Sequence, residues 1–137
     1  MALFVETHKV TEGLTALAIG TDQMFAGILL GHLIPYVAIV PSARYDSTFS
    51  PADAVQYRLL LGKAHGTITL KHAAPTGDAF LDAGRFIVDN ADLLLAVWDG
   101  KPAQGKGGTA DIVLYAQETA KPIFHIDTEH FTTREIG

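Results

Sequence analysis

The residues best suited to chemistry lie in one glycine-rich segment, W-D-G-K-P-A-Q-G-K-G-G-T-A-D, at positions 98–111. Its glycines let the backbone turn tightly or approach a ligand, and they are Gly100, Gly105, Gly107 and Gly108. We expect a helix to begin near Thr109, and the free N–H groups at a helix N-terminus bind anions. The segment therefore predicts a site for the phosphate of a nucleotide or nucleotide-derived ligand.

Polar side chains in this segment add to the predicted site. Thr109 can cap the helix or donate its hydroxyl to a phosphate oxygen, and Lys101 and Lys106 can supply positive charge. Asp99 ends a buried strand, where it can bind ribose hydroxyls or simply cap the turn. The segment is not a Walker A loop, because no Gly-Lys-Ser/Thr ends it, and it is not G-x-G-x-x-G either.

A second polar segment, Gly20, Thr21 and Asp22, follows an earlier predicted strand. Open α/β sheets bind ligands at the carboxyl ends of their strands, so we predict that these three residues contact the ligand. Helix capping by Asp22 is the alternative. Tyr45 and Phe49 flank another loop, where they either stack on a base or cover the core.

Short apolar runs alternate along the chain with helical patterns. We predict helices over 23–30, 51–63, 78–90 and 109–119, and strands over 14–19, 36–40, 66–70, 93–98 and 122–126. The run L-L-L-A-V-W carries no polar alternation, which is typical of a parallel strand buried on both faces. The order predicts a single α/β domain spanning 1–137, with a three-layer, Rossmann-like, mostly parallel sheet and helices on both faces.

The N-terminus departs from this pattern. Residues 2–5 resemble a strand, but only residues 6–13 separate them from the next one. A parallel crossover needs about a dozen residues or more. We therefore expect this first strand to be antiparallel at an edge or placed away from the second, with the N-terminal strand-helix unit shortened.

Composition excludes several classes of function. The net charge is −5 and only ten residues are Lys or Arg, which argues against bulk nucleic-acid binding. There is no cysteine and no histidine pair at i and i+4, so we predict no metal site and no cofactor. No apolar run reaches the roughly 20 residues of a membrane span. The start, M-A-L-F-V-E-T-H-K-V, lacks a secretory pattern, so we expect a cytoplasmic protein without membrane contact.

The glycine-rich segment and its surroundings resemble the SLOG superfamily, which includes the LOG phosphoribohydrolases and DprA-type DNA-processing domains. The similarity covers most of the chain from about Leu14 to Ile126 and rests on A-V-W-D-G-K-P-A-Q-G-K-G-G-T-A-D-I-V, V-D-N-A-D-L-L-L, D-A-F-L-D-A-G-R and I-G-T-D-Q-M-F-A. The resemblance implies a Rossmann-like fold that binds nucleotides or nucleotide-derived ligands. It also implies a homodimer or a higher homo-oligomer.

The resemblance also bears on catalysis. LOG enzymes carry P-G-G-x-G-T-x-x-E, and its Gly-Thr pair matches Gly108 and Thr109. The third residue after Thr109 is Ile112, however, and the carboxylate lies one position earlier, at Asp111. One residue rotates a helical side chain by about 100°. We therefore predict a non-catalytic or sensing site. The alternative is a phosphoribohydrolase-like nucleotide N-glycosidase or a nucleoside transferase, with Asp99 and Asp111 as catalytic carboxylates.

Overall fold

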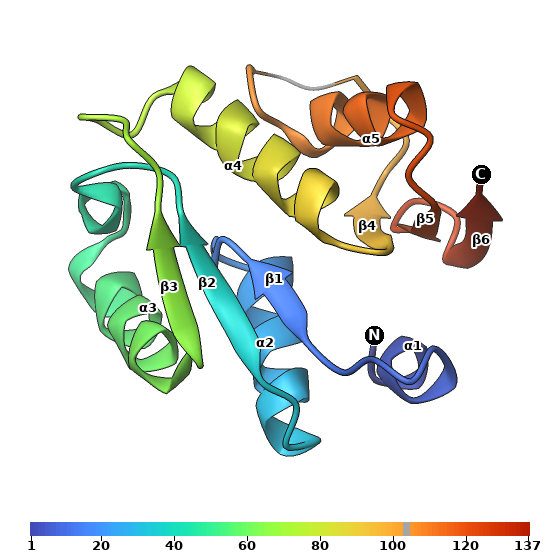
Figure 1. Cartoon of the computed structure of the whole chain (residues 1–137), viewed down its shortest axis with the longest axis horizontal. Helices are drawn as coiled ribbons and strands as arrows, with labels where there is room; N and C mark the ends of the chain where they lie inside the picture. The colour runs from blue at the N-terminus through green and yellow to red at the C-terminus, as the bar shows by residue number, and fades with distance from the viewer. Residues whose placement is uncertain (103–104) are drawn as a thin grey trace. The chain divides into compact units, whose positions relative to one another are not determined.

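The computed structural model describes residues 1–102 and 105–137, so Ala103 and Gln104 of the glycine-rich segment lie outside the described residues. The chain forms two compact units, Met1–Pro75 and Thr76–Gly137, which are described in turn (Figure 1). Both units combine helices with parallel strands, so the predicted α/β class is confirmed. Within the described ranges, no helix is long and apolar enough to cross a membrane.

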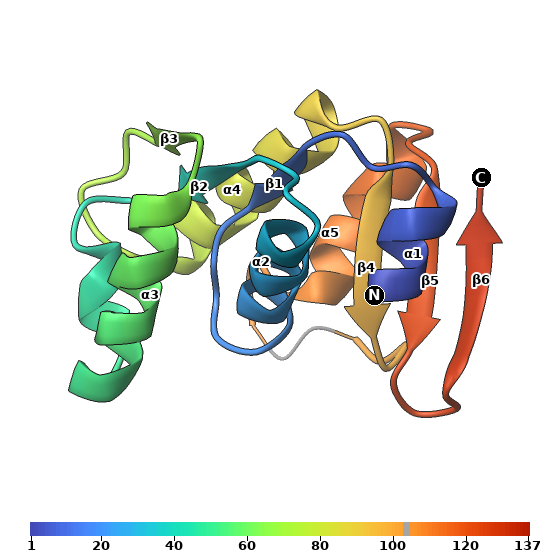
Figure 2. The same cartoon turned by 90° about the horizontal axis from the view of Figure 1, so that it is seen from below.

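The first unit contains a parallel sheet of order β1-β2-β3. Its strands and main helices are β1 (Gly13–Thr15), α2 (Thr21–Gly31), β2 (Tyr36–Val40), α3 (Pro51–Lys63) and β3 (Gly66–Thr69). Both crossovers advance in the same direction along the sheet, and right-handed crossovers then place both helices on one face. Figure 2 shows α2 and α3 on the same side of these strands.

Local sequence signals explain how α3 begins. Ser50 is the N-cap, and its hydroxyl accepts the amide of Asp53 at 3.2 Å, while Pro51 occupies the first helical position. Before α3, the short 3₁₀ helix η1 (Tyr45–Thr48) brings Tyr45 against Phe49 and Tyr57. The Phe49 and Tyr57 rings stack at 4.8 Å, so these aromatic residues cover the core of this unit.

Two sequence expectations for the first unit are wrong. Residues 2–5 form the helix α1 (Ala2–Thr7) and not a strand. The adjacent side chains of Phe4 and Val5 are both buried, whereas a strand would turn them to opposite faces. The strand predicted over 14–19 ends at Thr15, because Leu17 adopts φ +57° and its amide donates to the Thr15 hydroxyl.

The second unit carries a mixed sheet of order β4-β5-β6. Its elements are α4 (Gly77–Asn90), β4 (Leu94–Trp98), α5 (Thr109–Glu118), β5 (Ile123–Asp127) and β6 (Thr132–Ile136). Figure 2 shows β4 and β5 running the same way and β6 returning beside β5. Strand β6 was not predicted, because T-T-R-E-I is short and largely polar, and four of its five residues are exposed.

Helices α4 and α5 of this unit pack closely against each other. A Cβ atom on Gly84 of α4 would overlap the Ile112 side chain of α5, so only glycine allows this approach. The core between the helices and the sheet contains Val88, Leu94, Ala96, Val113, Ala116 and Ile123. This packing fixes the orientation of α5 and therefore the position of its N-terminus.

Candidate ligand site at the carboxyl ends of β4 and β5

The glycine-rich segment leaves the carboxyl end of β4 and leads to the N-terminus of α5. Strands β4 and β5 are parallel, with Trp98 opposite Asp127, so both end at the same edge of the sheet. The helix that follows β4 starts at this edge as well. Asp99, Thr109 and the turn after β5 therefore all lie toward the edge at which α/β sheets bind ligands.

The backbone at Gly107 and Gly108 forms hydrogen bonds with the first turn of α5, the helix that follows it. Gly107 adopts φ +85°, and its amide donates to Oδ2 of Asp111 at 3.0 Å. Gly108 is the N-cap of α5, and its carbonyl accepts the amide of Asp111 at 3.1 Å. The Gly107 amide therefore has its hydrogen-bond acceptor within the protein, and Oδ2 of Asp111 has its donor.

Gly107 is also required by helix packing. A Cβ atom at this position would lie 2.8 Å from both the backbone nitrogen of Leu81 and the Cβ of Phe80, two residues of α4. Real Cβ atoms essentially never approach other atoms this closely, and backbone cannot move aside as a flexible side chain can. The close approach that this glycine permits is therefore to α4. In contrast, no described residue lies within 4 Å of a Cβ atom built on Gly100 or Gly105.

Two backbone donors remain at the start of α5. Within the described ranges, neither the Thr109 amide nor the Ala110 amide has an acceptor. The first N–H groups of any helix lack an intrahelical partner, and the helix dipole makes this end positive. Thr109 is exposed, so its hydroxyl lies at the surface beside these amides.

The two lysines of the segment make exposed ion pairs. Lys106 pairs with Asp78 of α4, and the Nζ atom of Lys101 lies 3.8 Å from Oε2 of Glu129. Exposed pairs of this kind contribute only about 0–1 kcal/mol. A bound anion can therefore compete for either lysine.

Asp99 is exposed at the end of β4. Its Oδ1 atom accepts the amide of Lys101 at 2.9 Å, which closes a turn, and the Lys101 carbonyl in turn accepts the indole N–H of Trp98 at 2.9 Å. The second carboxylate oxygen of Asp99 has no partner in the part of the chain that the structure describes. It is available to a ligand.

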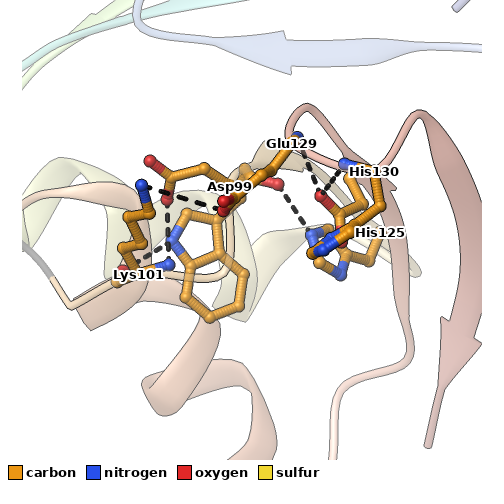
Figure 3. Close-up of polar contacts among 7 residues, drawn as sticks. Asp99, Lys101, His125, Glu129 and His130 are labelled. Carbon is orange, nitrogen blue, oxygen red and sulfur yellow. Dashed lines mark hydrogen bonds and ion pairs between the residues drawn. The ribbon is translucent and has the colours of Figure 1, made fainter.

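The turn after β5 adds a histidine, His130, to this edge (Figure 3). Oδ1 of Asp127 accepts the amides of Glu129 at 2.9 Å and His130 at 3.0 Å, and Oδ2 accepts Nδ1 of His130 at 3.0 Å. The backbone and side-chain hydrogen bonds from His130 hold the pKa of Asp127 at about 2. The same carboxylate raises the pKa of His130. A D-x-x-H pattern directly after a strand was the available sequence signal.

The buried side chain of His125, in β5, forms a hydrogen bond with the end of β4. Its Nε2 donates to the Trp98 carbonyl at 2.9 Å, and its Nδ1 accepts Nε of Arg134 at 3.3 Å. The Trp98 carbonyl also accepts the amide of Thr128 at 3.2 Å. The ends of β4 and β5 are therefore joined at the level of the candidate site.

Gly20, Thr21 and Asp22 belong to the first unit. Gly20 is the N-cap of α2 with φ +91°, and Oδ2 of Asp22 accepts the amide of Ala18 at 3.3 Å. Burial raises the pKa of Asp22. The carboxylate closes the loop before its helix, as Asp111 does. The ligand contact predicted for these three residues remains a prediction.

No protein-family model matches the chain, and no curated protein matches it in sequence. The resemblance to the SLOG superfamily, and the oligomer that it implies, remain predictions drawn from the motifs.

Proposed function

We propose that this protein binds the phosphate of a nucleotide or nucleotide-derived ligand at the N-terminus of α5, without turnover. One observation carries the proposal: the amides of Thr109 and Ala110 lack acceptors among the described residues. They lie at the positive end of a helix, beside the exposed Thr109 side chain. Backbone donors in this arrangement bind a phosphate without net positive charge on the protein.

Asp99 supports a ligand that carries a sugar as well as a phosphate. Its exposed carboxylate ends the strand that delivers the segment, and one of its oxygens has no partner in the described ranges. In nucleotide-binding α/β folds, ligands bind outside the carboxyl ends of the strands, and a carboxylate accepts a hydrogen bond from a ribose hydroxyl. The motif resemblance implies the same class of ligand.

The geometry favours binding over N-glycoside hydrolysis. Oδ2 of Asp111 accepts the Gly107 amide, so this carboxylate has a structural partner. The position where LOG enzymes carry a catalytic glutamate holds Ile112, which packs against Gly84 of α4. A residue at this position is therefore turned toward the helix interface.

Calorimetry with nucleoside mono- and diphosphates, cyclic nucleotides and ADP-ribose derivatives tests the proposal. We expect Thr109→Val to weaken binding several-fold through loss of one hydroxyl, and Thr109→Pro to weaken it about tenfold or more through loss of an amide as well. Proline suits this first helical position, and the preceding Gly108 has the extended conformation, φ −70° and ψ 170°, that proline requires.

Thr67→Val, which changes an exposed threonine of β3 in the other unit, is the matched control and should bind like wild type. Circular dichroism should show the same helix content in Thr109→Pro as in wild type. Absence of binding to every member of the panel at millimolar concentration would overturn the proposal, as would undiminished affinity in Thr109→Pro.

A further inference from the structure

The hairpin turn Thr128–Phe131 is fixed beside the end of β4. The Thr128 amide donates to the Trp98 carbonyl at 3.2 Å, directly before Asp99. Glu129 pairs with Lys101 at 3.8 Å, which links the turn to the glycine-rich segment. Figure 3 shows Asp99, Lys101, Glu129 and His130 at this edge. The turn is therefore part of the surface that surrounds Asp99.

Within this turn, the imidazole of His130 is held in one orientation. Nδ1 donates to Asp127, whose side chain is only 19% exposed, while the His130 side chain is 71% exposed. Nε2 has no partner among the residues that the structure describes. When Nδ1 of a neutral imidazole carries the proton, Nε2 is a hydrogen-bond acceptor. His130 thus presents an oriented acceptor to solvent.

The charges around the imidazole decide which ligand group it suits. The imidazole interacts electrostatically with the carboxylates of Asp127 and Glu129, and Glu129 also forms an ion pair with Lys101. Asp99 adds a further carboxylate at the end of β4. A surface with this excess of negative charge disfavours a phosphate but accepts hydrogen bonds from hydroxyls.

We propose that Nε2 of His130 accepts a hydrogen bond from a sugar hydroxyl of the bound nucleotide, with Asp127 as the positioning residue. This inference rests on the proposed function, in which the phosphate occupies the N-terminus of α5. Asp99 and His130 then contact the sugar from the ends of neighbouring strands. A ligand without hydroxyls gains nothing from His130.

Three probes separate these contacts by calorimetry: AMP, its 2′,3′-dideoxy analogue and inorganic phosphate, all at a pH above the pKa of His130. We expect His130→Ala to weaken AMP binding about threefold to tenfold, the loss of one hydrogen bond, and to leave the other two probes unaffected. His130→Gln, which retains an acceptor, should recover part of the affinity. His65→Ala, at an exposed histidine in the other unit, is the control.

The His130→Ala variant should keep the turn intact, because Oδ1 of Asp127 still accepts the amides of Glu129 and residue 130. NMR titration of the His130 ring gives a second readout. A hydroxyl that donates to Nε2 stabilises the neutral imidazole, so AMP should lower the pKa of His130. A phosphate in contact with the ring would raise that pKa.

The outcomes distinguish the two proposals. If wild type binds AMP and His130→Ala binds it equally well, or if AMP raises the pKa of His130, the sugar contact is wrong and the phosphate site stands. If wild type binds none of the nucleotides or phosphate, the phosphate site itself is wrong, and the sugar contact fails with it.

Discussion

The carboxylate of Asp111 accepts the amide of Gly107 at 3.0 Å, four residues earlier in the chain. Asp22 repeats this relationship in the first unit, where it accepts the amide of Ala18 at 3.3 Å. In both loops a glycine is the N-cap and the aspartate lies in the first turn of the helix. Each strand-to-helix loop is thus closed by a carboxylate of the helix that follows it.

Asp111→Ala should lower the free energy of unfolding by about 1 kcal/mol, because it leaves the Gly107 amide without its acceptor. Urea denaturation measures this loss. Glu118→Ala, which removes an exposed carboxylate from the other end of α5, should change stability by less than about 0.5 kcal/mol. Equal stability of Asp111→Ala and wild type would show that the carboxylate does not close the loop.

Alanine substitutions at three glycines of the segment distinguish the cost of backbone strain from the cost of a steric clash. Gly107→Ala combines a positive φ with a steric clash against α4 and should cost more than about 2 kcal/mol. Gly100→Ala has φ +83° and no described residue within 4 Å of the new methyl group, so it should cost about 1 kcal/mol. Gly105→Ala meets no atom of the described residues within 4 Å and should be close to neutral. Thermal unfolding of the three variants checks this order, and a Gly107→Ala protein as stable as Gly105→Ala would refute the packing against α4.

The contact between Gly84 and Ile112 predicts coupled mutations. Gly84→Ala should destabilise the protein by about 1–3 kcal/mol, because the new methyl group overlaps the Ile112 side chain. Combining it with Ile112→Ala makes room for that methyl group, so the double variant should be more stable than the sum of the single changes predicts. A double-mutant cycle by urea denaturation measures the coupling, and strict additivity would contradict the contact.

Much of the α/β pattern could be predicted, because strong local signals agreed with the packing. Ser50 and Pro51 marked the start of α3, and the apolar run ending at Trp98 marked β4. Where local and tertiary signals differed, prediction failed. The sequence around Phe4 fits either a strand or a helix, and only the burial of two adjacent side chains distinguishes them.

For the candidate site, the sequence predicted where its residues lie in the fold but not which contacts they make. Glycines and Asp99 identified the end of β4. Nothing in the sequence indicated that Gly107 faces α4 or that Asp111 turns back to its amide, because both depend on how α5 packs. His130 was missed because its significance depends on the β5–β6 hairpin, and β6 was not predicted.

The turn after β5 should give stability a measurable acid dependence. Hydrogen bonds depress the pKa of Asp127 from 3.8 to about 2, so its charge stabilises the folded state above pH 3.8. This contribution disappears as the pH falls through about 2. The difference in unfolding free energy between wild type and Asp127→Asn should therefore shrink over this interval. A constant difference for Asp127→Asn across this interval would contradict the hydrogen bonds.

Asp22 predicts the opposite dependence. Burial raises its pKa in the folded state, so the ionised carboxylate costs stability once the pH exceeds that pKa, and the cost is absent below 3.8. Asp22→Asn keeps an acceptor for the Ala18 amide and removes the charge, so it should be more stable than wild type at neutral pH, with the advantage declining toward acid.

Asp53→Asn provides the matched control. That exposed first-turn carboxylate complements the dipole of α3, so its loss should destabilise by about 0.3–1 kcal/mol at neutral pH. Urea denaturation across the pH range measures both variants, and an Asp22→Asn protein less stable than wild type at neutral pH would show that the charge itself is needed to close the loop.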